Sequence, residues 1–348
     1  MKTRAFHKPA GKSVWFGSDL IKSDEWIFEL PKHAIEEIDA CLMRLKASGK
    51  PLEDIDASDV QLGSLDNVCK SIREEVATGR GFVVVRGLPA EKYSLDELSM
   101  IYWGIGSHFG HAMPQSFLGD RLGTIMDLSD EETDPAKRRG YHSGGAQHVH
   151  TDSCDIVSML SIRPAQSGGE ARLCSAHTVH NLMLEHCPGL LQVLYDGFFL
   201  RGTDTDAAAL GRPAFYGYRV PAYAYTDGWL NCSFVRGYVD RAVKAGDISL
   251  SAVEQAAVEA FAAFSNHPDV CLDTLLQPGD MQFVNNRTML HGRAHFDDFP
   301  ERDRRRFLLR LWLSVDSWPR MAPLQNMHSD AIKLKWEEAA AARRATAH

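Results

Sequence analysis

The sequence of 348 residues lacks the features that mark membrane, secreted or nucleic-acid-binding proteins. It has no run of 18 apolar residues, and its first residues form no apolar segment, so we expect neither a membrane span nor a signal peptide. No long basic stretch is present, and the net charge of −8 disfavours nucleic acid as a partner. We therefore expect a cytoplasmic protein with a small-molecule ligand; assembly into a homo-oligomer stays open.

Cysteine is scarce and irregularly placed. There are seven cysteines, an odd number, and none lies in a C-x-x-C pair. This excludes a disulfide framework and a Cys-type zinc site, and it fits a reducing compartment. With 44% hydrophobic and 24% charged residues, no internal repeat and no low-complexity linker, the chain is typical of one globular unit. We expect a single domain over residues 1–348, with an N-terminal helical region at 1–79.

Helices and strands are expected along the whole chain. Apolar residues at helical spacing predict helices around 35–45 and 68–76, and further helices are expected at about 95–109, 178–194 and 252–264. Ser251 and Glu254 have the spacing of a capping box, which predicts the start of the last of these helices. Apolar and β-branched runs predict strands at five places: 81–89, 156–162, 272–276, 281–284 and 306–314.

Two segments far apart in the sequence carry candidate metal ligands. His150 and Asp152 are two residues apart, and an extended backbone points such side chains to the same face. They follow a glycine-rich polar loop and precede a predicted buried strand, a usual place for ligand-binding residues. The H-x-D pattern alone is weak, because in a chain with 15 His and 46 acidic residues it arises by chance. A surface His beside a solvated Asp is the alternative.

His291 is the candidate third ligand. It follows a predicted hairpin whose turn, Gln277–Asp280, is expected to be of type I or II. Gly292 is expected to let the backbone pass close to a metal without an intruding side chain. Two His and one carboxylate on one octahedral face are the ligand set of non-haem Fe(II) oxygenases, which keep open positions for a co-substrate and O₂. If His150, Asp152 and His291 converge, the chain is an oxygen-activating iron enzyme.

The strand at 306–314 is expected to have two different faces. On one face lie four large apolar residues, Phe307, Leu309, Leu311 and Leu313. The other face carries Arg306, Leu308, Arg310, Trp312 and Ser314. One face is expected to pack on a core, and the other holds two fixed cations where anionic ligands could bind.

The order of these motifs resembles the taurine dioxygenase family of Fe(II)/2-oxoglutarate oxygenases, relatives of clavaminate synthase. The motifs are HTD at 150–152, GGEARLCSAHTVHNLM at 168–183, QPGDMQFVNNRTMLHGR at 277–293 and RRRFLLRLWLS at 304–314. The resemblance covers roughly residues 80–315. It implies an α+β fold with a double-stranded β-helix (jelly roll) core, flanking helices and an insertion.

The resemblance also implies an activity. Such enzymes use Fe(II), 2-oxoglutarate and O₂, and they couple decarboxylation of 2-oxoglutarate to succinate and CO₂ with hydroxylation of a C–H bond. The expected substrate is a small polar molecule, anionic or amino-acid-like. Desaturation or cyclisation with the same cofactors is the alternative. A non-enzymatic jelly-roll binding module would have no physical reason to keep the ligand set and Arg306.

The resemblance assigns roles residue by residue. His150, Asp152 and His291 match the metal ligands, and the intact Asp152 argues against the related halogenases, in which a small residue replaces it. Arg306 matches the residue that binds the distal carboxylate of 2-oxoglutarate. Arg310 matches a second Arg near the iron-bound end, which often meets an anionic group of the substrate.

Three further positions are less regular. The family often has Thr or Ser after the Gly-Gly-acid turn to hold the co-substrate, but this chain has Ala171, and Ser175 is the candidate replacement. Gln115 borders the expected substrate site and is a candidate substrate contact. Residues 204–240 are rich in aromatic side chains, which either pack an insertion onto the barrel or form a lid over the substrate.

Two other pairs of histidines have metal-ligand spacing. His291 and His295 are four residues apart, as in helical zinc sites, but Gly292 and the strand-like surroundings disfavour a helix there. His148 and His150 could also act as a pair, yet this would leave Asp152 without a role. His148 is therefore expected to support the site or to lie in a plain loop.

Overall fold

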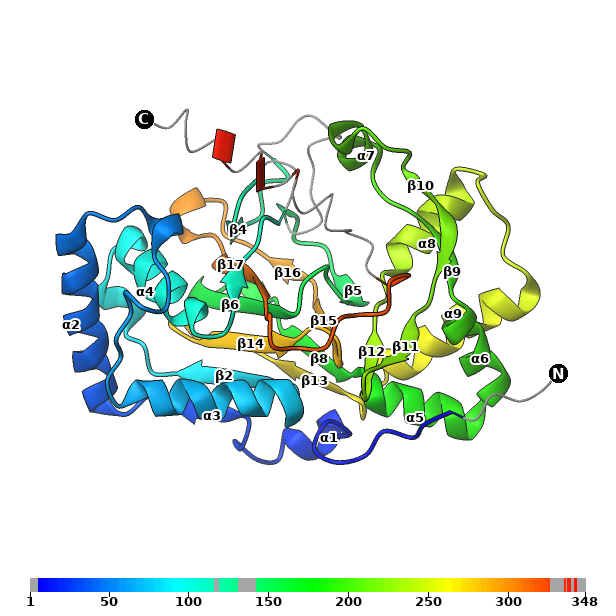
Figure 1. Cartoon of the computed structure of the whole chain (residues 1–348), viewed down its shortest axis with the longest axis horizontal. Helices are drawn as coiled ribbons and strands as arrows, with labels where there is room; N and C mark the ends of the chain where they lie inside the picture. The colour runs from blue at the N-terminus through cyan, green and yellow to red at the C-terminus, as the bar shows by residue number, and fades with distance from the viewer. Residues whose placement is uncertain are drawn as a thin grey trace.

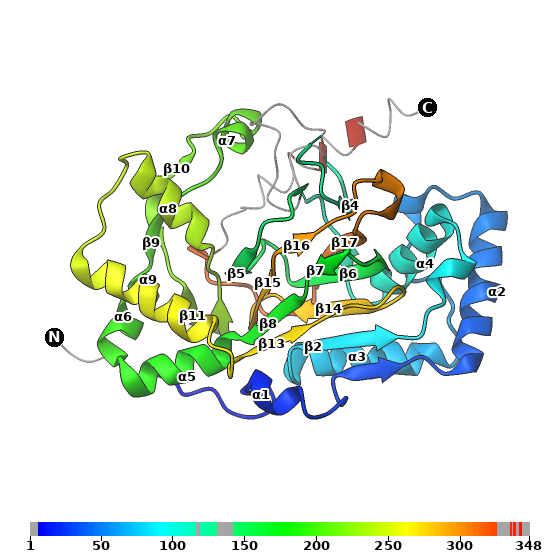
Figure 2. The same cartoon turned by 180° about the vertical axis from the view of Figure 1, so that it is seen from behind.

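Figures 1 and 2 show the computed structural model, which describes residues 6–115, 119–130, 142–325 and, near the C-terminus, 335, 337, 338, 341 and 342. Its centre is a jelly roll of two β-sheets. The larger sheet has the strand order β1-β2-β14-β6-β17-β3, with β4 also paired to β17. Its strands are β1 (Ile27–Glu29), β2 (Phe82–Arg86), β3 (His111–Ala112), β4 (Leu122–Ile125), β6 (Ile156–Arg163), β14 (Met281–Asn285) and β17 (Phe307–Ser314).

The smaller sheet has the order β13-β8-β15-β5. It consists of β13 (Cys271–Thr274), β8 (Ala171–Ser175), β15 (Met289–Arg293) and β5 (Gln147–His150). The two sheets share a core in which Phe82 and Val284 of the larger sheet pack with Leu173 and Leu272 of the smaller one. This arrangement confirms the jelly roll expected from the sequence. A short ribbon of β7 (Ser167–Gly168) and β16 (Phe296–Asp297) adjoins it.

Helices cover the outer faces of the core, and N-terminal helices pack on the larger sheet. Their apolar residues join those of β14 and β17 in one core cluster, in which Ile38, Ile72 and Tyr102 meet Phe283 and Leu309. In Figure 1 these helices lie on the left and below the sheets. They are α2 (Lys32–Ser48), α3 (Leu65–Thr78) and α4 (Leu95–Ser107), and the short α1 (Gly17–Leu20) contacts β13.

A second helical layer, at the opposite end in both figures, surrounds its own core cluster. It contains α5 (Ala176–His186), α6 (Pro188–Asp196), α8 (Arg236–Lys244) and α9 (Ala252–Ser265). The expected capping box is present, because Ser251 Oγ accepts from the backbone N–H of Glu254 while the Glu254 carboxylate accepts from the backbone N–H of Ser251. Among the described residues, no helix combines the length and the apolar character needed to cross a membrane.

The turn before β14 is of type II. Gly279 has a φ of +88°, and the N–H of Asp280 donates to the carbonyl of Gln277. A Cβ atom on Gly279 would lie 1.9 Å from the carbonyl oxygen of Leu88, so both the backbone conformation and the space require glycine. This turn sets the register in which β14 enters the larger sheet.

The aromatic segment at 204–240 forms α7 (Asp204–Leu210), β10 (Phe215–Val220), β11 (Tyr223–Thr226), β12 (Trp229–Cys232) and the first part of α8, and β10 pairs with β9 (Phe198–Arg201). Tyr216, Tyr223 and Phe234 belong to the second core cluster, whereas Tyr218 and Tyr225 are exposed. At least three of its aromatic side chains therefore pack as core. Its end approaches the candidate site, because the Thr151 N–H donates to the Phe234 carbonyl.

Candidate metal centre and co-substrate cavity

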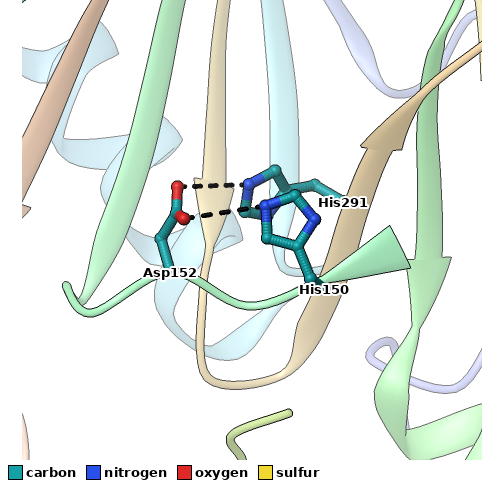
Figure 3. A group of neighbouring side chains, drawn as sticks. All are labelled: His150, Asp152 and His291. Carbon is teal, nitrogen blue, oxygen red and sulfur yellow. Dashed lines mark ion pairs between the residues drawn. The ribbon is translucent and has the colours of Figure 1, made fainter. Parts of the chain in front are cut away.

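The structure brings His150, Asp152 and His291 together, as Figure 3 shows. One potential ligand atom from each side chain lies within 4.8 Å of the other two. His150 Nε2 is 3.6 Å from Asp152 Oδ1, and His291 Nε2 is 3.4 Å from Asp152 Oδ2. Two imidazole nitrogens and one carboxylate oxygen therefore surround a point that one metal ion could occupy. This is the facial ligand set predicted from the sequence.

Strand pairing fixes the two histidines. β15 runs antiparallel to β5, and His291 stands directly opposite His150, with their ring centroids 4.5 Å apart. Asp152 lies just beyond β5, in the link that leads to β6 of the larger sheet. The site is thus built where the chain passes from one sheet to the other.

Asn286 holds the Asp152 link in place. Its side-chain oxygen accepts from the Asp152 N–H at 2.7 Å, and its side-chain nitrogen donates to the carbonyls of Asp152 and Cys154 at 2.6 and 2.8 Å. Asn286 is itself buried. Three hydrogen bonds from one rigid side chain fix the backbone that carries the carboxylate, so the folded chain preorganises this ligand.

Two further contacts orient the ligands. The His150 Nδ1–H donates to the carbonyl of His148 at 2.8 Å, which leaves Nε2 with a free lone pair toward the metal position. The indole N–H of Trp312 donates to Asp152 Oδ2 at 3.0 Å. His148 is exposed and contributes through its backbone, as expected of a residue outside the ligand set. His295 is exposed, and its Nε2 lies 3.3 Å from Asp297 Oδ1.

The electrostatics of the cluster favour an ionised Asp152 carboxylate. Burial acts to raise the pKa of Asp152, but hydrogen bonds to His150 and His291 and their charges hold it well below its usual range. Burial and the charge of His150 lower the pKa of His291. For His150, burial acts to lower the pKa, and the interaction with Asp152 outweighs it, so the pKa is raised.

The pairing of β15 with β5 requires a glycine at position 292. A Cβ atom there would lie 2.6 Å from the carbonyl oxygen of Gln147 and 3.1 Å from the amide nitrogen of Val149. The glycine therefore lets β15 approach the backbone of β5, at an irregularity in the pairing between His291 and Arg293. It brings the two strands that carry His150 and His291 together, and it also lines the cavity beside these histidines.

An internal cavity lies between the two sheets beside the ligand set. Its wall includes the two histidines His150 and His291 and the three arginines Arg293, Arg306 and Arg310. Arg306 is only 8% exposed, and no described residue forms an ion pair or side-chain hydrogen bond with its guanidinium. Burial and the charge of Arg293 lower the pKa of Arg306 to about 10, and burial lowers that of Arg293 to about 10. Such a cavity is suited to an anion.

Arg310 and Gln115 form a unit at the same cavity. The Nε–H of Arg310 donates to Gln115 Oε1 at 2.6 Å, and the Gln115 amide donates to the carbonyls of Arg310 and Arg121. Gly123 stands opposite Arg310 in the sheet, and a Cβ atom there would lie 2.6 Å from Gln115 Oε1. With these three bonds Gln115 positions Arg310, and a contact of Gln115 with the substrate stays a prediction. Arg310 faces the ligand set, with Nη1 4.0 Å from Asp152 Oδ2.

Ser175 lies outside this cavity. Its hydroxyl donates to the carbonyl of Ser13 at 2.5 Å and accepts from the N–H of Thr178, where it caps the start of α5. Both bonds are structural, and the side chain is fully buried. The expectation that Ser175 replaces the missing hydroxyl of Ala171 is therefore corrected. Ala171 itself lines the cavity.

Several residues of the site were not expected from the sequence. The sequence predicts the face of the strand on which Trp312 lies but not its partner, and no local pattern marks Asn286. Gln282 on β14 also lines the cavity, although its sequence context shows only a buried strand. Their partners lie more than 100 residues away in the chain, so local spacing contains no sign of these contacts.

Comparison with known proteins identifies the group to which the chain belongs. The model of the family described as taurine catabolism dioxygenase TauD, TfdA matches residues 48–312. The chain belongs to this family. FR-33289 synthase of Streptomyces rubellomurinus (strain ATCC 31215), a relative of this TauD/TfdA member, is 29% identical over 312 residues, which cover 88% of this chain and 90% of the relative.

Solved structures support the fold. An asparagine oxygenase in complex with Fe(II), 2S,3S-3-hydroxyasparagine and succinate aligns with a TM-score of 0.66 at 12% identity, over 83% of this chain and 94% of its own. The non-heme iron oxygenase OrfP in complex with Fe and alpha-ketoglutaric acid, which is 2-oxoglutarate, aligns with a TM-score of 0.59 at 14% identity, over the same shares. The TauD/TfdA chain is an Fe(II)- and 2-oxoglutarate-dependent dioxygenase that uses O₂.

Proposed function

We propose that this dioxygenase hydroxylates a C–H bond of a small polar substrate, anionic or amino-acid-like, at the His150–Asp152–His291 centre. One observation carries the proposal: a two-His, one-carboxylate set adjoins a cavity whose buried cation, Arg306, has no described ion-pair partner. The donor set fits Fe(II), and the buried guanidinium fits the distal carboxylate of 2-oxoglutarate, because it can form two parallel charge-assisted hydrogen bonds with it.

Each residue of the centre and of the adjoining cavity has its own role in the proposed reaction. Iron, when bound, supplies the oxidising chemistry with O₂ and 2-oxoglutarate. His150, Asp152 and His291 would hold the ion. Arg306 orients the co-substrate from its distal end. Arg310, held by Gln115 and facing the ligand set, is placed to meet the carboxylate at the metal end of the same molecule.

A second cavity supports the proposed substrate class. It has a volume of about 580 Å³, is lined by Asp152 and shares none of its lining residues with the Arg306 cavity. Its wall is polar and carries both signs of charge, and it includes Ser153, Ser233, Asp316 and Arg320. No described residue pairs with the Arg320 guanidinium. Separate acidic and basic groups suit a zwitterion, and the asparagine oxygenase of similar fold was solved with an amino-acid product.

Succinate release tests the activity. The enzyme is incubated with Fe(II), ascorbate, 2-oxoglutarate and a panel of amino acids and small sulfonates. The mass of the product is then measured by mass spectrometry. Hydroxylation adds one oxygen atom to the substrate, whereas desaturation or cyclisation removes two hydrogens, so the product mass separates the alternatives. His291→Ala is expected to abolish substrate-dependent succinate release while the protein stays folded. Retention of more than a tenth of the activity would remove His291 from the centre.

A further inference from the structure

Gln282 lies on the inner face of the larger sheet. Side chains of a β-strand alternate between faces, and its neighbours Met281 and Phe283 belong to the core under the N-terminal helices. Val284, on the same face as Gln282, packs with Leu173 of the opposite sheet. Gln282 therefore points between the sheets, into the interior where the co-substrate cavity lies.

The side-chain amide of Gln282 is buried and has an unused donor. The residue is 4% exposed and lines the cavity together with Arg306. Its Nε2 atom is buried without a hydrogen-bond partner among the described residues. A buried amide without a partner destabilises the fold, and native proteins keep such groups where something else uses them. An amide among the apolar residues of a strand is thus out of place unless a ligand accepts from it.

The chemistry of the cavity indicates which ligand this is. A carboxylate offers about four acceptor positions, and one guanidinium satisfies two of them through its parallel N–H groups. A buried charged pair is stable only when the remaining lone pairs also find donors. On the facing sheet, Ala171 offers only a methyl group to this cavity. A neutral donor that adds no charge beside Arg306 and Arg293 completes the set.

We propose that the Gln282 amide donates a hydrogen bond to the 2-oxoglutarate carboxylate that Arg306 holds, and that it is a co-substrate-binding residue of this chain. The inference rests on the co-substrate occupying the Arg306 cavity, as stated under the proposed function. It assigns to β14, a strand of the larger sheet, a binding role in addition to those of β17 and the metal-bearing strands. The donor replaces the hydroxyl that position 171 lacks.

The test measures binding and needs no turnover. 2-Oxoglutarate is titrated into the anaerobic Fe(II) enzyme by calorimetry, for the wild type and for Gln282→Leu, which keeps an apolar side chain as far as Cδ but removes the donor. We expect the dissociation constant to rise about 10- to 100-fold, as for the loss of a hydrogen bond to a charged group. Gln282→Glu places a carboxylate beside Arg306 and is expected to weaken binding further, because it competes with the ligand.

Matched controls separate the possible failures. Met159→Leu changes a neighbouring residue of the same cavity without touching a donor, and its dissociation constant should stay within threefold of the wild type. 2-Oxobutyrate, which lacks the distal carboxylate, should bind the wild type and Gln282→Leu equally weakly. If Arg306→Met weakens 2-oxoglutarate binding but Gln282→Leu does not, the inference is wrong and the cavity assignment stands. If neither variant weakens it, both are wrong.

Discussion

Replacing Arg306 by methionine should make the ligand-free protein more stable and at the same time unable to hold 2-oxoglutarate. The guanidinium is buried, and none of the described side chains pairs with it. Its pKa of about 10, mainly a consequence of burial, corresponds to a destabilisation of the charged form by about 3 kcal/mol relative to water. Methionine keeps much of the apolar stem and removes the charge.

The expected gain is smaller than this figure, because methionine fills less space than arginine. Replacement of buried charges by apolar residues stabilises proteins by about 1 to 4 kcal/mol, and we expect a value near the lower end. The melting temperature of the metal-free protein should then rise by a few degrees. Loss of the bidentate partner costs about 2 to 5 kcal/mol of binding free energy, so the dissociation constant of 2-oxoglutarate should rise roughly 30-fold or more.

Scanning calorimetry with and without 2-oxoglutarate measures both effects on the same samples. The wild type should be stabilised by the ligand according to its affinity, and Arg306→Met should not. Arg306→Lys is the control, since it keeps a buried cation and loses only the planar fork; it should show no gain in melting temperature and an intermediate affinity. A variant Arg306→Met that melts below the wild type and still responds fully to 2-oxoglutarate would refute the reasoning.

Three further predictions concern other parts of the molecule. Trp312→Phe keeps an aromatic ring but removes the N–H that donates to Asp152. Metal titration should show that the affinity for Fe(II) is reduced about 10- to 100-fold. An unchanged affinity would indicate that the indole only fills space. His180 is buried, and burial lowers its pKa to about 4, so below pH 6.5 the unfolded chain binds more protons than the folded one. As the pH is lowered from about 6.5 to 4, the free energy of unfolding should therefore fall by up to about 3 kcal/mol, and by less in His180→Phe. Urea unfolding measures this, and an equal dependence on pH in the wild type and the variant would contradict it. Part of residues 204–240 should become less sensitive to limited proteolysis when iron, 2-oxoglutarate and the substrate are present together, and cleavage that is equal with and without them would assign the segment to core packing alone.

Much of the fold could be predicted from local pattern. The alternation at 306–314 correctly separated the core face of β17, with Leu309 and Leu311, from the face that carries Arg306 and Arg310. The helical stripes and the capping box at Ser251 located three helices, because these features depend on residues within one or two turns. The candidate metal ligands could be predicted because the motifs that carry them resemble those of the TauD/TfdA family.

The remaining contacts could not be predicted in this way, since they join distant segments. Ser175 looked like a free hydroxyl beside the co-substrate, but helix capping uses it. Gln115 was placed near the site, yet its three hydrogen bonds to Arg310 and Arg121 depend on how β4 and β17 pair. Gln282 looked like one more residue of a buried strand. In each case the role depends on which polar atoms the tertiary fold leaves without a partner.

The hydrogen bonds of Asn286 to the Asp152 link have a consequence for how the protein obtains its metal. Because Asn286 fixes the backbone that carries Asp152, this carboxylate is in place before an ion arrives, and the three side chains leave the other coordination positions to outside ligands. The affinity of two nitrogens and one oxygen for divalent ions then increases in the order Mn²⁺, Fe²⁺, Co²⁺, Ni²⁺, Cu²⁺, and the affinity for Zn²⁺ is lower than that for Cu²⁺. Nickel leached from an affinity column, or zinc from a buffer, would displace iron and yield a folded, inactive protein. The fraction of the protein that holds iron would depend on which metals are present during folding and purification. Preparations made with chelator and excess ferrous iron should therefore differ most in activity from the others.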